Sequence, residues 1–234
     1  MISTVQRIVD LEWNMLLQSA RMEGAADVEG DKKIFSDMRS AQFSAWSDKS
    51  AESYLTDLNI AAAGNRNLII EKNIRAMRIY DPGQYEEIKD ILEPISEKKD
   101  ALVTEISDIL IAQMEQCYKK YPNVSTGQQL RSSEDTDEMM SVETHQKAEF
   151  MTYSEETLEL LLADIKELEG RGESLAENIL DNSIRIYGFE SLAAADKAIE
   201  EKKNEVYVTP DFSGCCGTDG CPEDGCSGGS CTIR

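Results

Sequence analysis

Histidine is almost absent from this sequence, which contains only His145 in 234 residues. Hydrolases with a serine or cysteine nucleophile take their general base from a histidine, and di-iron helical bundles use Glu-x-x-His pairs on two helices. Glu143 stands two residues before His145, which is the wrong spacing for such a pair. The shortage of histidine therefore argues against both of these classes.

Positive charge is also scarce, because 24 lysines and arginines stand against 45 aspartates and glutamates, for a formal net charge of −21. Nucleic acids and anionic membrane surfaces bind proteins through basic faces, so we expect neither as a partner. No stretch is apolar for long enough to cross a bilayer, and the opening residues MISTVQRIVDLEW lack the features of a signal peptide. We expect a cytoplasmic location and a protein as the macromolecular partner.

Patterns typical of β-strands are missing as well, since no alternation of apolar and polar residues persists and no internal repeat is present. Apolar residues instead recur at spacings of three and four, which predicts helices. The apolar content of 41% is sufficient for the core of one helical domain. We predict an all-α fold, a multi-helix, bundle-like single domain over residues 1–207, followed by a flexible Gly/Cys-rich tail over 208–234.

Capping residues, glycines and prolines set the expected helix boundaries. Ser3, Ser154 and Ser174 are predicted to cap the first turn of the helix that follows each of them. The predicted helices cover about 3–22 and 33–47, then a helix that carries Tyr54 to Ile60 and ends near Gly64, then about 67–80, 85–92, 96–121 and 138–153, 154 to near Gly170, 174 to near Gly188, and about 191–205. The apolar stripes of the second and third helices are expected to include Phe35, Met38, Gln42, Trp46, Tyr54, Leu55, Leu58 and Ile60.

Several polar residues fall on or beside helix faces that should be buried. Glu12 continues the apolar progression of Val5, Val9 and Leu16, and a buried carboxylate needs a partner. The candidates that we select for a ligand pocket are Glu12, Arg39, Gln42, Trp46, Arg66, Glu71, Arg75, Glu143 and Glu149. One interpretation is a polar pocket that binds a small charged ligand or a metal. The other is a set of buried ion pairs that fixes the helix register, with Trp46 as a core residue.

Six segments, in order along residues 1 to about 203, resemble the bacterial domain of unknown function 4125. They are IVDLEWNM (8–15), FSDMRSAQFSAW (35–46), GNRNLIIEKNIRAM (64–77), RSSEDT (131–136), ETHQKAEFMTYS (143–154) and IYGFESL (186–192). The resemblance implies a helical fold and no known activity. Positions that match the family's pattern include all nine pocket candidates, and also Trp13, Asn67, Lys72, Arg131, Asp135, Thr144 and Tyr153.

One loop departs from the family's pattern. The family's first loop typically reads Gly-Gly-Arg-Ala-Ser-Cys-Gln-Asp-Asp, whereas residues 23–31 here read EGAADVEGD. Because both the arginine and the cysteine are missing, chemistry carried by that cysteine in relatives would need a tail thiol here.

Five of the six cysteines lie in the last 20 residues, and the remaining one, Cys117, is predicted to be a small buried residue. The tail cysteines are Cys215, Cys216, Cys221, Cys226 and Cys231, of which the last four recur at an interval of five residues. Four thiolates in one flexible segment can enclose a zinc ion or an iron–sulfur (Fe–S) cluster. Two alternatives stay open, namely thiol redox or sulfur-transfer chemistry and a tail without defined chemistry.

Three functions are compatible with these features. The leading hypothesis is a metal- or cluster-binding accessory or carrier protein whose helical domain recognises a partner or a small ligand. The second is an enzyme in which the pocket around Glu12, Arg39, Glu71 and Glu149 acts on a small charged ligand while the thiols supply electrons or a metal. The third is a scaffold whose acidic faces bind a basic protein partner.

Overall fold

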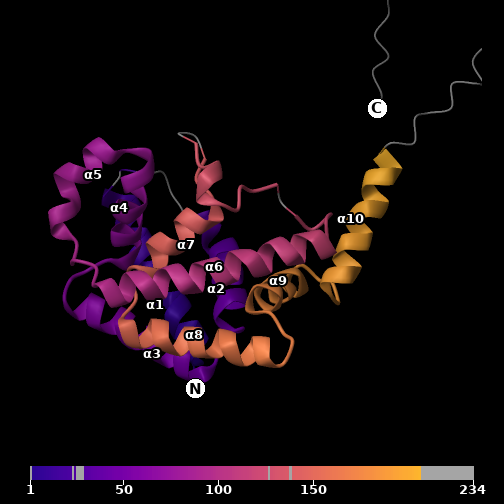
Figure 1. Ribbon diagram of the computed structural model, residues 1–234, viewed down its shortest axis with the longest axis horizontal. Helices are drawn as coiled ribbons and strands as arrows, with labels where there is room; N and C mark the ends of the chain where they lie inside the picture. The colour runs from indigo at the N-terminus through magenta and orange to yellow at the C-terminus, as the bar shows by residue number, and fades with distance from the viewer. Residues whose placement is uncertain (1, 23, 25–28, 126, 137–138, 207–234) are drawn as a thin grey trace, which may run out of the picture.

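The computed structural model describes residues 2–22, 24, 29–125, 127–136 and 139–206 (Figure 1). Within these ranges the chain forms ten α-helices and three short 3-10 helices and contains no β-strand, which confirms the predicted all-α fold. The α-helices are α1 (Thr4–Met22), α2 (Lys32–Phe43), α3 (Asp48–Ala63), α4 (Leu68–Tyr80), α5 (Pro82–Ile88), α6 (Glu97–Lys120), α7 (Val142–Phe150), α8 (Glu155–Gly170), α9 (Leu175–Ile186) and α10 (Leu192–Val206). The predicted tail over 208–234 and its five cysteines lie outside the described residues.

The three predicted serine caps are present. Ser3 Oγ accepts from the amide of Gln6 at 3.1 Å, and Ser154 and Ser174 accept at the same distance from the third amide of α8 and α9. Each bond satisfies a backbone donor that has no partner inside the helix, a contribution of about 1 kcal/mol. These side chains therefore fix where the helices begin.

The longest helix, α6, crosses the middle of the molecule and packs against α7, α8 and α9. A second group forms around α1, which contacts α2, α3 and α4. The contact of α3 with α8 and that of α2 with α9 join the two groups. In Figure 1, α4 and α5 lie at one end of the molecule, and α10 lies at the other, where it packs against α9.

A single apolar core occupies the space between these helices. Its members include Ile8, Leu55, Leu58, Ile106, Leu110, Leu158, Leu161, Ile165 and Leu175, none of them more than 5% exposed. Burial of one such side chain contributes about 1.5–3 kcal/mol, so this core is the main source of stability. Cys117 is also buried, at 3% exposed, as predicted.

The second helix differs from the prediction, because α2 ends at Phe43 instead of near residue 47. The chain turns after it, with the amide of Trp46 donating to the carbonyl of Phe43 at 3.3 Å, and this turn places Trp46 in the core. The predicted apolar stripes were wrong at Met38 and Ile60, which are 61% and 62% exposed. The spacing of three and four between apolar residues indicated a longer helix, because Trp46 keeps that spacing although the chain has already turned after Phe43.

Two other helices begin at residues different from those predicted. Asp81 accepts from the amide of Gln84 at 3.0 Å and caps α5, so Pro82 opens this helix instead of belonging to a turn before it. The helix predicted from residue 138 starts at Val142, because Ser141 accepts from the amide of Thr144 at 3.2 Å. Both starts follow from short polar caps.

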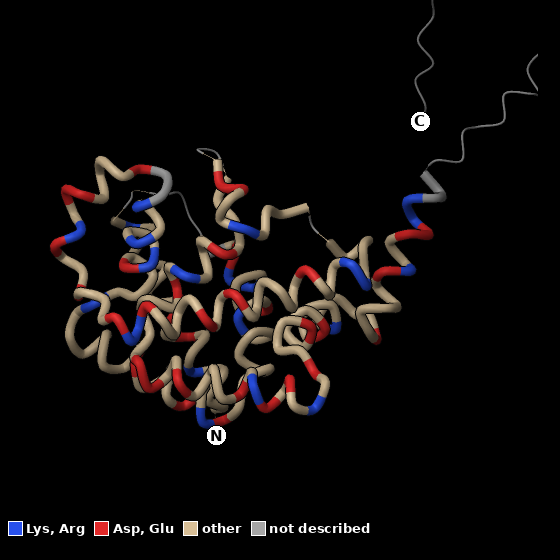
Figure 2. Tube along the Cα trace, viewed as in Figure 1, with Lys and Arg blue, Asp and Glu red and all other residues tan. Residues whose placement is uncertain are grey.

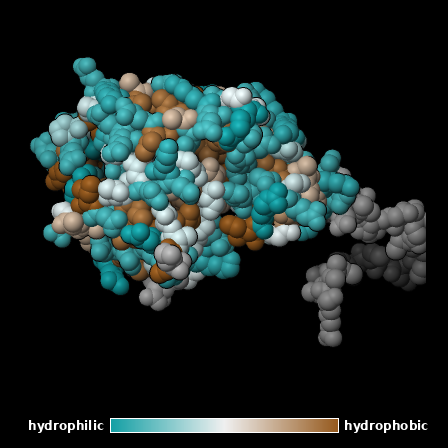
Figure 3. All heavy atoms as spheres, turned by 90° about the horizontal axis from the view of Figure 1, so that it is seen from below, coloured by the Kyte–Doolittle hydropathy of each residue, from teal (hydrophilic) through white to brown (hydrophobic). Residues whose placement is uncertain are grey.

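Figure 2 shows acidic residues along all the described helices, with basic residues interspersed among them. On the face shown in Figure 3, hydrophobic side chains form separate patches between hydrophilic ones. None of the described helices combines the length and the apolar character needed to span a membrane.

We predict that a chain ending at Val208 keeps its helical circular dichroism and its melting temperature, because the described helices are complete by Val206. The matched comparison is a chain ending at Tyr187, which also lacks α10 and its buried Leu192 and Ala195. That chain should melt at a lower temperature because it loses apolar burial. A large loss of helix on truncation at Val208 would contradict the division at residue 207.

Candidate functional site

A charged network lies inside the bundle around the guanidinium group of Arg39 on α2. Arg39 Nε donates to Glu12 Oε2 of α1 at 2.6 Å, and its Nη2 donates to Glu149 Oε1 of α7 at 2.9 Å. Nη1 donates to Gln42 Oε1 at 2.8 Å. The side chain of Glu12 is 1% exposed, and those of Arg39 and Glu149 are 14% and 15% exposed. The arginine therefore holds two largely buried carboxylates from different helices.

Three further side chains complete this network. The hydroxyl of Tyr54 on α3 donates to Glu12 Oε1 at 2.7 Å, and that of Tyr153 donates to Glu149 Oε1 at 2.7 Å. Lys72 of α4 pairs with Glu149 Oε2 at 3.2 Å. Two carboxylates thus face two cations, so the network carries no net charge and connects α1, α2, α3, α4 and α7.

The ionisation of the network follows from these contacts. Burial by itself would raise the pKa of Glu149, but the charges of Arg39 and Lys72 outweigh it and hold this pKa far below 4.5. Burial, and then the neighbouring carboxylates, raise the pKa of both Tyr54 and Tyr153 well above 10. Near neutral pH the tyrosines are hydrogen-bond donors, and Glu149 is an ionised acceptor.

An aromatic cluster covers the network. The ring of Tyr54 lies 5.2 Å from that of Phe43 and 4.4 Å from that of Tyr153, and Trp46 lies 6.1 Å from both tyrosines, between ring centroids. The guanidinium carbon of Arg39 is 4.8 Å from the centroid of the Phe43 ring, which is a cation–π contact. These rings keep water away from the ion pairs and so strengthen them.

A cavity of about 250 Å³ adjoins the network and is called the central cavity below. Its lining residues come from the end of α2 and from α6, α7, α8 and α9. They are Gln42, Trp46, Leu110, Met114, Val142, His145, Gln146, Glu149, Phe150, Leu161, Leu175, Ala176, Ile179 and Leu180. Most of this lining is apolar, and its polar groups gather on α7 and at Gln42.

His145 and Glu149 lie one helical turn apart on α7 and both line the central cavity. Burial of part of the side chain, and then the charge of Lys72, lower the pKa of His145 below 6.5, although the residue as a whole is exposed to solvent. The imidazole is therefore mostly neutral at pH 7, so it can donate one hydrogen bond and accept another.

The nine predicted pocket residues fall into three groups. Glu12, Arg39, Gln42, Trp46 and Glu149 form the network or line the central cavity. The second group consists of Arg66, Glu71 and Arg75, and Glu143 belongs to the third. No interaction among the described residues joins Arg39 to Glu71.

The second group centres on α4. Arg66 holds both carboxylate oxygens of Glu71 at 2.8 Å and pairs with Glu93 at 3.1 Å. Arg75 donates to the carbonyl of Glu93 at 3.0 Å.

In the third group, Glu143 pairs with Lys147 at 2.6 Å and accepts from the amide of Ser132 at 2.8 Å. It therefore ties the short 3-10 helix Ser132–Glu134 to α7.

Sequence reasoning leaves three important residues out of the pocket. Tyr54 is predicted only as part of an apolar stripe, Lys72 only as a member of a polar run that matches the family's pattern, and His145 is given no role. The spacing of four residues between His145, Glu149 and Tyr153 is the signal that places all three together.

The described residues offer no metal site. Over the residues that the structure describes, no group of three or more histidine, cysteine, aspartate or glutamate side chains is arranged to hold a metal ion. The metal prediction therefore rests on Cys215, Cys216, Cys221, Cys226 and Cys231, which lie outside those residues.

Fold and site together define an all-helical protein with a neutral charged network in its interior and a small, mostly apolar cavity beside it. The chain belongs to the family described as protein of unknown function (DUF4125), whose profile matches residues 3–197. This match confirms the resemblance seen in the sequence. The comparison with curated proteins gave no match, and neither did the comparison with solved structures.

We predict that Glu149→Gln lowers the free energy of unfolding at pH 7 by about 3–5 kcal/mol, because it leaves Arg39 and Lys72 short of a buried counter-charge. The stabilisation from Glu149 is present above the unfolded pKa of 4.5 and is lost as the pH falls toward the lower folded value. The difference between wild type and variant should therefore shrink below about pH 5. Denaturant titrations at several pH values measure it.

The control for this prediction is Glu167→Gln on α8, whose carboxylate is 72% exposed and pairs with Arg171 at 2.7 Å. It should change the free energy of unfolding by less than about 1 kcal/mol. Equal effects of the two substitutions at pH 7 would show that the interior network is not a special source of stability.

Proposed function

We propose that this protein is a carrier in two parts. The helical domain binds a small, largely apolar molecule in the central cavity, and the tail cysteines bind a thiophilic metal or an Fe–S cluster. We further propose that it works in the cytoplasm, because a reducing compartment keeps thiols available to metals. A carrier delivers its metal to another molecule, and we propose that this molecule is a protein.

The observation that carries the first part is the size and lining of the central cavity. An engineered apolar cavity of about 150 Å³ is known to stay dry and to bind benzene. The central cavity, at about 250 Å³, has room for a molecule as large as a bicyclic ring. The amides of Gln42 and Gln146 and the imidazole of His145 can hydrogen-bond one polar group of such a molecule.

The state of the carboxylates favours binding over acid–base catalysis. Glu149 is held ionised and has hydrogen bonds or ion pairs on both oxygens. A general acid or base needs a pKa near the working pH and access to the substrate. Histidine is the side chain whose ordinary pKa lies nearest to neutrality. Among the described cavity residues, the alternative of an enzyme acting on a small charged ligand therefore depends on His145.

The five-residue spacing of the tail cysteines carries the second part. Successive ligands at this spacing are at most about 17 Å apart when extended, so the chain must fold back to bring the sulfurs to about 2.3 Å from one metal. Glycines between the cysteines, such as Gly217 and Gly225, permit such turns at little steric cost.

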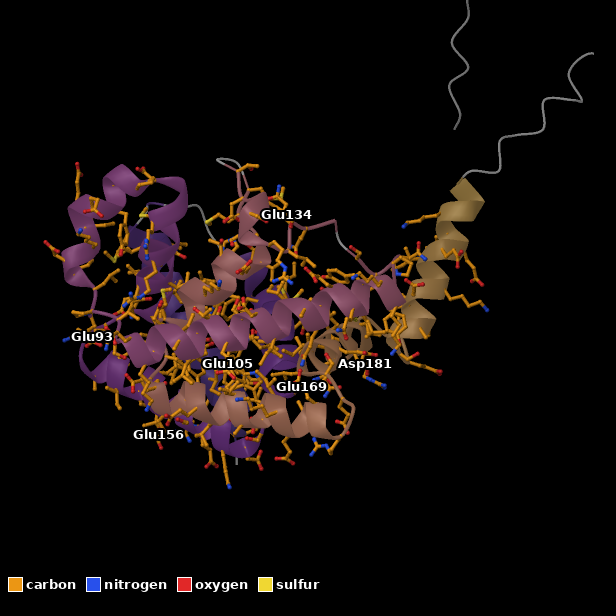
Figure 4. The ribbon with its side chains drawn as sticks, viewed as in Figure 1. Glu93, Glu105, Glu134, Glu156, Glu169 and Asp181 are labelled. Atoms are coloured by element: carbon orange, nitrogen blue, oxygen red, sulfur yellow. The ribbon has the colours of Figure 1, made fainter. Side chains whose placement is uncertain are left out.

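The scaffold alternative rests on the acidic surface. The carboxylates labelled in Figure 4 are spread over the described part of the molecule, from Glu93 in the segment before α6 to Glu156 on α8 and Asp181 on α9. An electrostatic docking face requires charge of one sign to be gathered together. This dispersion favours a solvated acidic surface over a single docking face.

We predict that the full chain, purified without oxygen, contains stoichiometric zinc, copper or iron, measured by elemental analysis. Replacement of any two of Cys216, Cys221, Cys226 and Cys231 by serine should abolish it, because a tetrahedral site needs its full set of ligands. Cys117→Ser is the control and should keep the metal, since Cys117 is buried in the helical domain. A reduced protein that contains and binds no such metal would rule out this part of the proposal.

We predict that indole raises the melting temperature of the protein by binding in the central cavity. Ala176→Phe should remove this effect by filling the cavity. Ala195→Phe is the matched control, because Ala195 is also buried but does not line the cavity. If indole acts equally on both variants, the cavity does not take up small molecules of this kind.

A further inference from the structure

A second concave site, called the α4 hollow here, lies between α4, α5, α7 and the segment around the start of α6. Its volume is about 390 Å³. It is lined by Arg75, Ala76, Arg78, Tyr85, Ile95, Asp100, Ser132, Thr144, Lys147, Ala148 and Met151, none of which lines the central cavity. It therefore is a separate site from the one already proposed.

Charge distinguishes the α4 hollow from the rest of the protein. Arg75, Arg78 and Lys147 contribute three positive charges to its lining and Asp100 contributes one negative charge, while Lys147 is also paired with Glu143 at 2.6 Å. The chain as a whole carries a net charge of −21. A concentration of positive charge in so acidic a protein creates a local attraction for anions.

The two arginines of the hollow lack carboxylate partners. Arg75 and Arg78 lie three residues apart on α4, where like charges repel each other. Within the described ranges, neither arginine forms an ion pair with an aspartate or a glutamate. Glu71, which lies one helical turn before Arg75, is already held by Arg66 at 2.8 Å. Both guanidinium groups therefore keep a positive charge that no carboxylate of the described residues neutralises by direct contact.

The guanidinium group of Arg75 is only partly satisfied. Its Nη2 donates to the carbonyl of Glu93 at 3.0 Å, but its Nε is buried and has no hydrogen-bond partner among the described residues. Burial lowers the pKa of Arg75 in spite of the nearby carboxylates of Glu71 and Glu93. A buried donor without a partner costs about 1–3 kcal/mol, and more when it belongs to a charged group.

Another cation, Lys99, lies close to Arg75. Lys99 of α6 is half-buried, and burial, followed by the charge of Arg75, lowers its pKa. Arg75 and Lys99 both line a smaller hollow that adjoins the first at Arg75. Arg75 and Lys99 are thus two neighbouring, partly buried cations. A bound anion would offset both their mutual repulsion and their loss of hydration.

We propose that the α4 hollow binds a small metabolite through a phosphate or carboxylate group held by Arg75. The planar guanidinium suits this role, because its parallel N–H groups match the oxygens of either anion. Arg78 adds positive charge beside the same hollow, and Ile95 and Met151 provide apolar contacts for the organic part of the ligand.

The test compares the melting temperature of the full chain in sodium phosphate, sodium acetate and sodium chloride at pH 7 and equal ionic strength. Phosphate or acetate should raise it in a saturable way beyond the effect of chloride. A response to phosphate alone identifies a phosphorylated ligand, and a response to acetate identifies a carboxylate. The absence of any response beyond that of chloride would overturn the proposal.

Arg75→Gln should weaken binding of the active anion by about tenfold or more, because it removes a charge-assisted hydrogen bond. In chloride alone this variant should melt no lower than the wild type, since it also removes an incompletely satisfied charge. Arg185→Gln is the matched control, because Arg185 pairs with Asp181 at 2.6 Å outside the hollow. It should keep the full anion response.

General stabilisation by phosphate would act equally on every variant. An anion response that survives in Arg75→Gln would therefore overturn the proposal. If Arg75→Gln does not fold, Arg75→Lys serves instead, because it keeps the charge but loses the planar donors. Equilibrium dialysis of inorganic phosphate against Arg75→Lys and wild type should then show weaker binding by the variant, and equal binding would contradict the assignment.

Discussion

The guanidinium group of Arg39 is largely removed from water, and a buried charge is tolerated only when it is paired and hydrogen-bonded. Glu12 and Glu149 supply that compensation from α1 and α7, and Lys72 balances the second carboxylate from α4. The helices α1, α2, α4 and α7 must therefore pack in the one arrangement that brings these four side chains together. The apolar core supplies most of the stability, while this network limits how its helices can be arranged.

The central cavity depends on the same constraint. Glu149 belongs to the network and also lines the cavity, so the positions of α2 and α7 determine both. The wall of the cavity is mostly apolar because most of its lining side chains are apolar, and the network beside it adds fixed ionic groups with no net charge. Such a wall favours a ligand held by its shape and one or two hydrogen bonds, and it disfavours a ligand with a large net charge.

In the α4 hollow, by contrast, the positive charge of the arginines is not neutralised by carboxylates of the described residues in direct contact. Arg39 has every nitrogen engaged by a described partner, whereas Arg75 has a buried Nε without one among the described residues. Two arginines in one protein thus illustrate the difference between a structural ion pair and a charge available to a ligand. Their distinction lies in the number of carboxylates that the fold brings to each, and not in the arginine side chain itself.

The sequence by itself determined the all-α class, the family, the serine caps and the candidacy of Glu12, Arg39 and Glu149, because helical periodicity and capping are local properties. Only the tertiary structure decided that the nine candidates divide into three groups, since this depends on how helices far apart in sequence pack together. The turn that buries Trp46 and the roles of Tyr54 and Lys72 were decided in the same way. Partners of a buried charge come from other helices, and no local pattern specifies them.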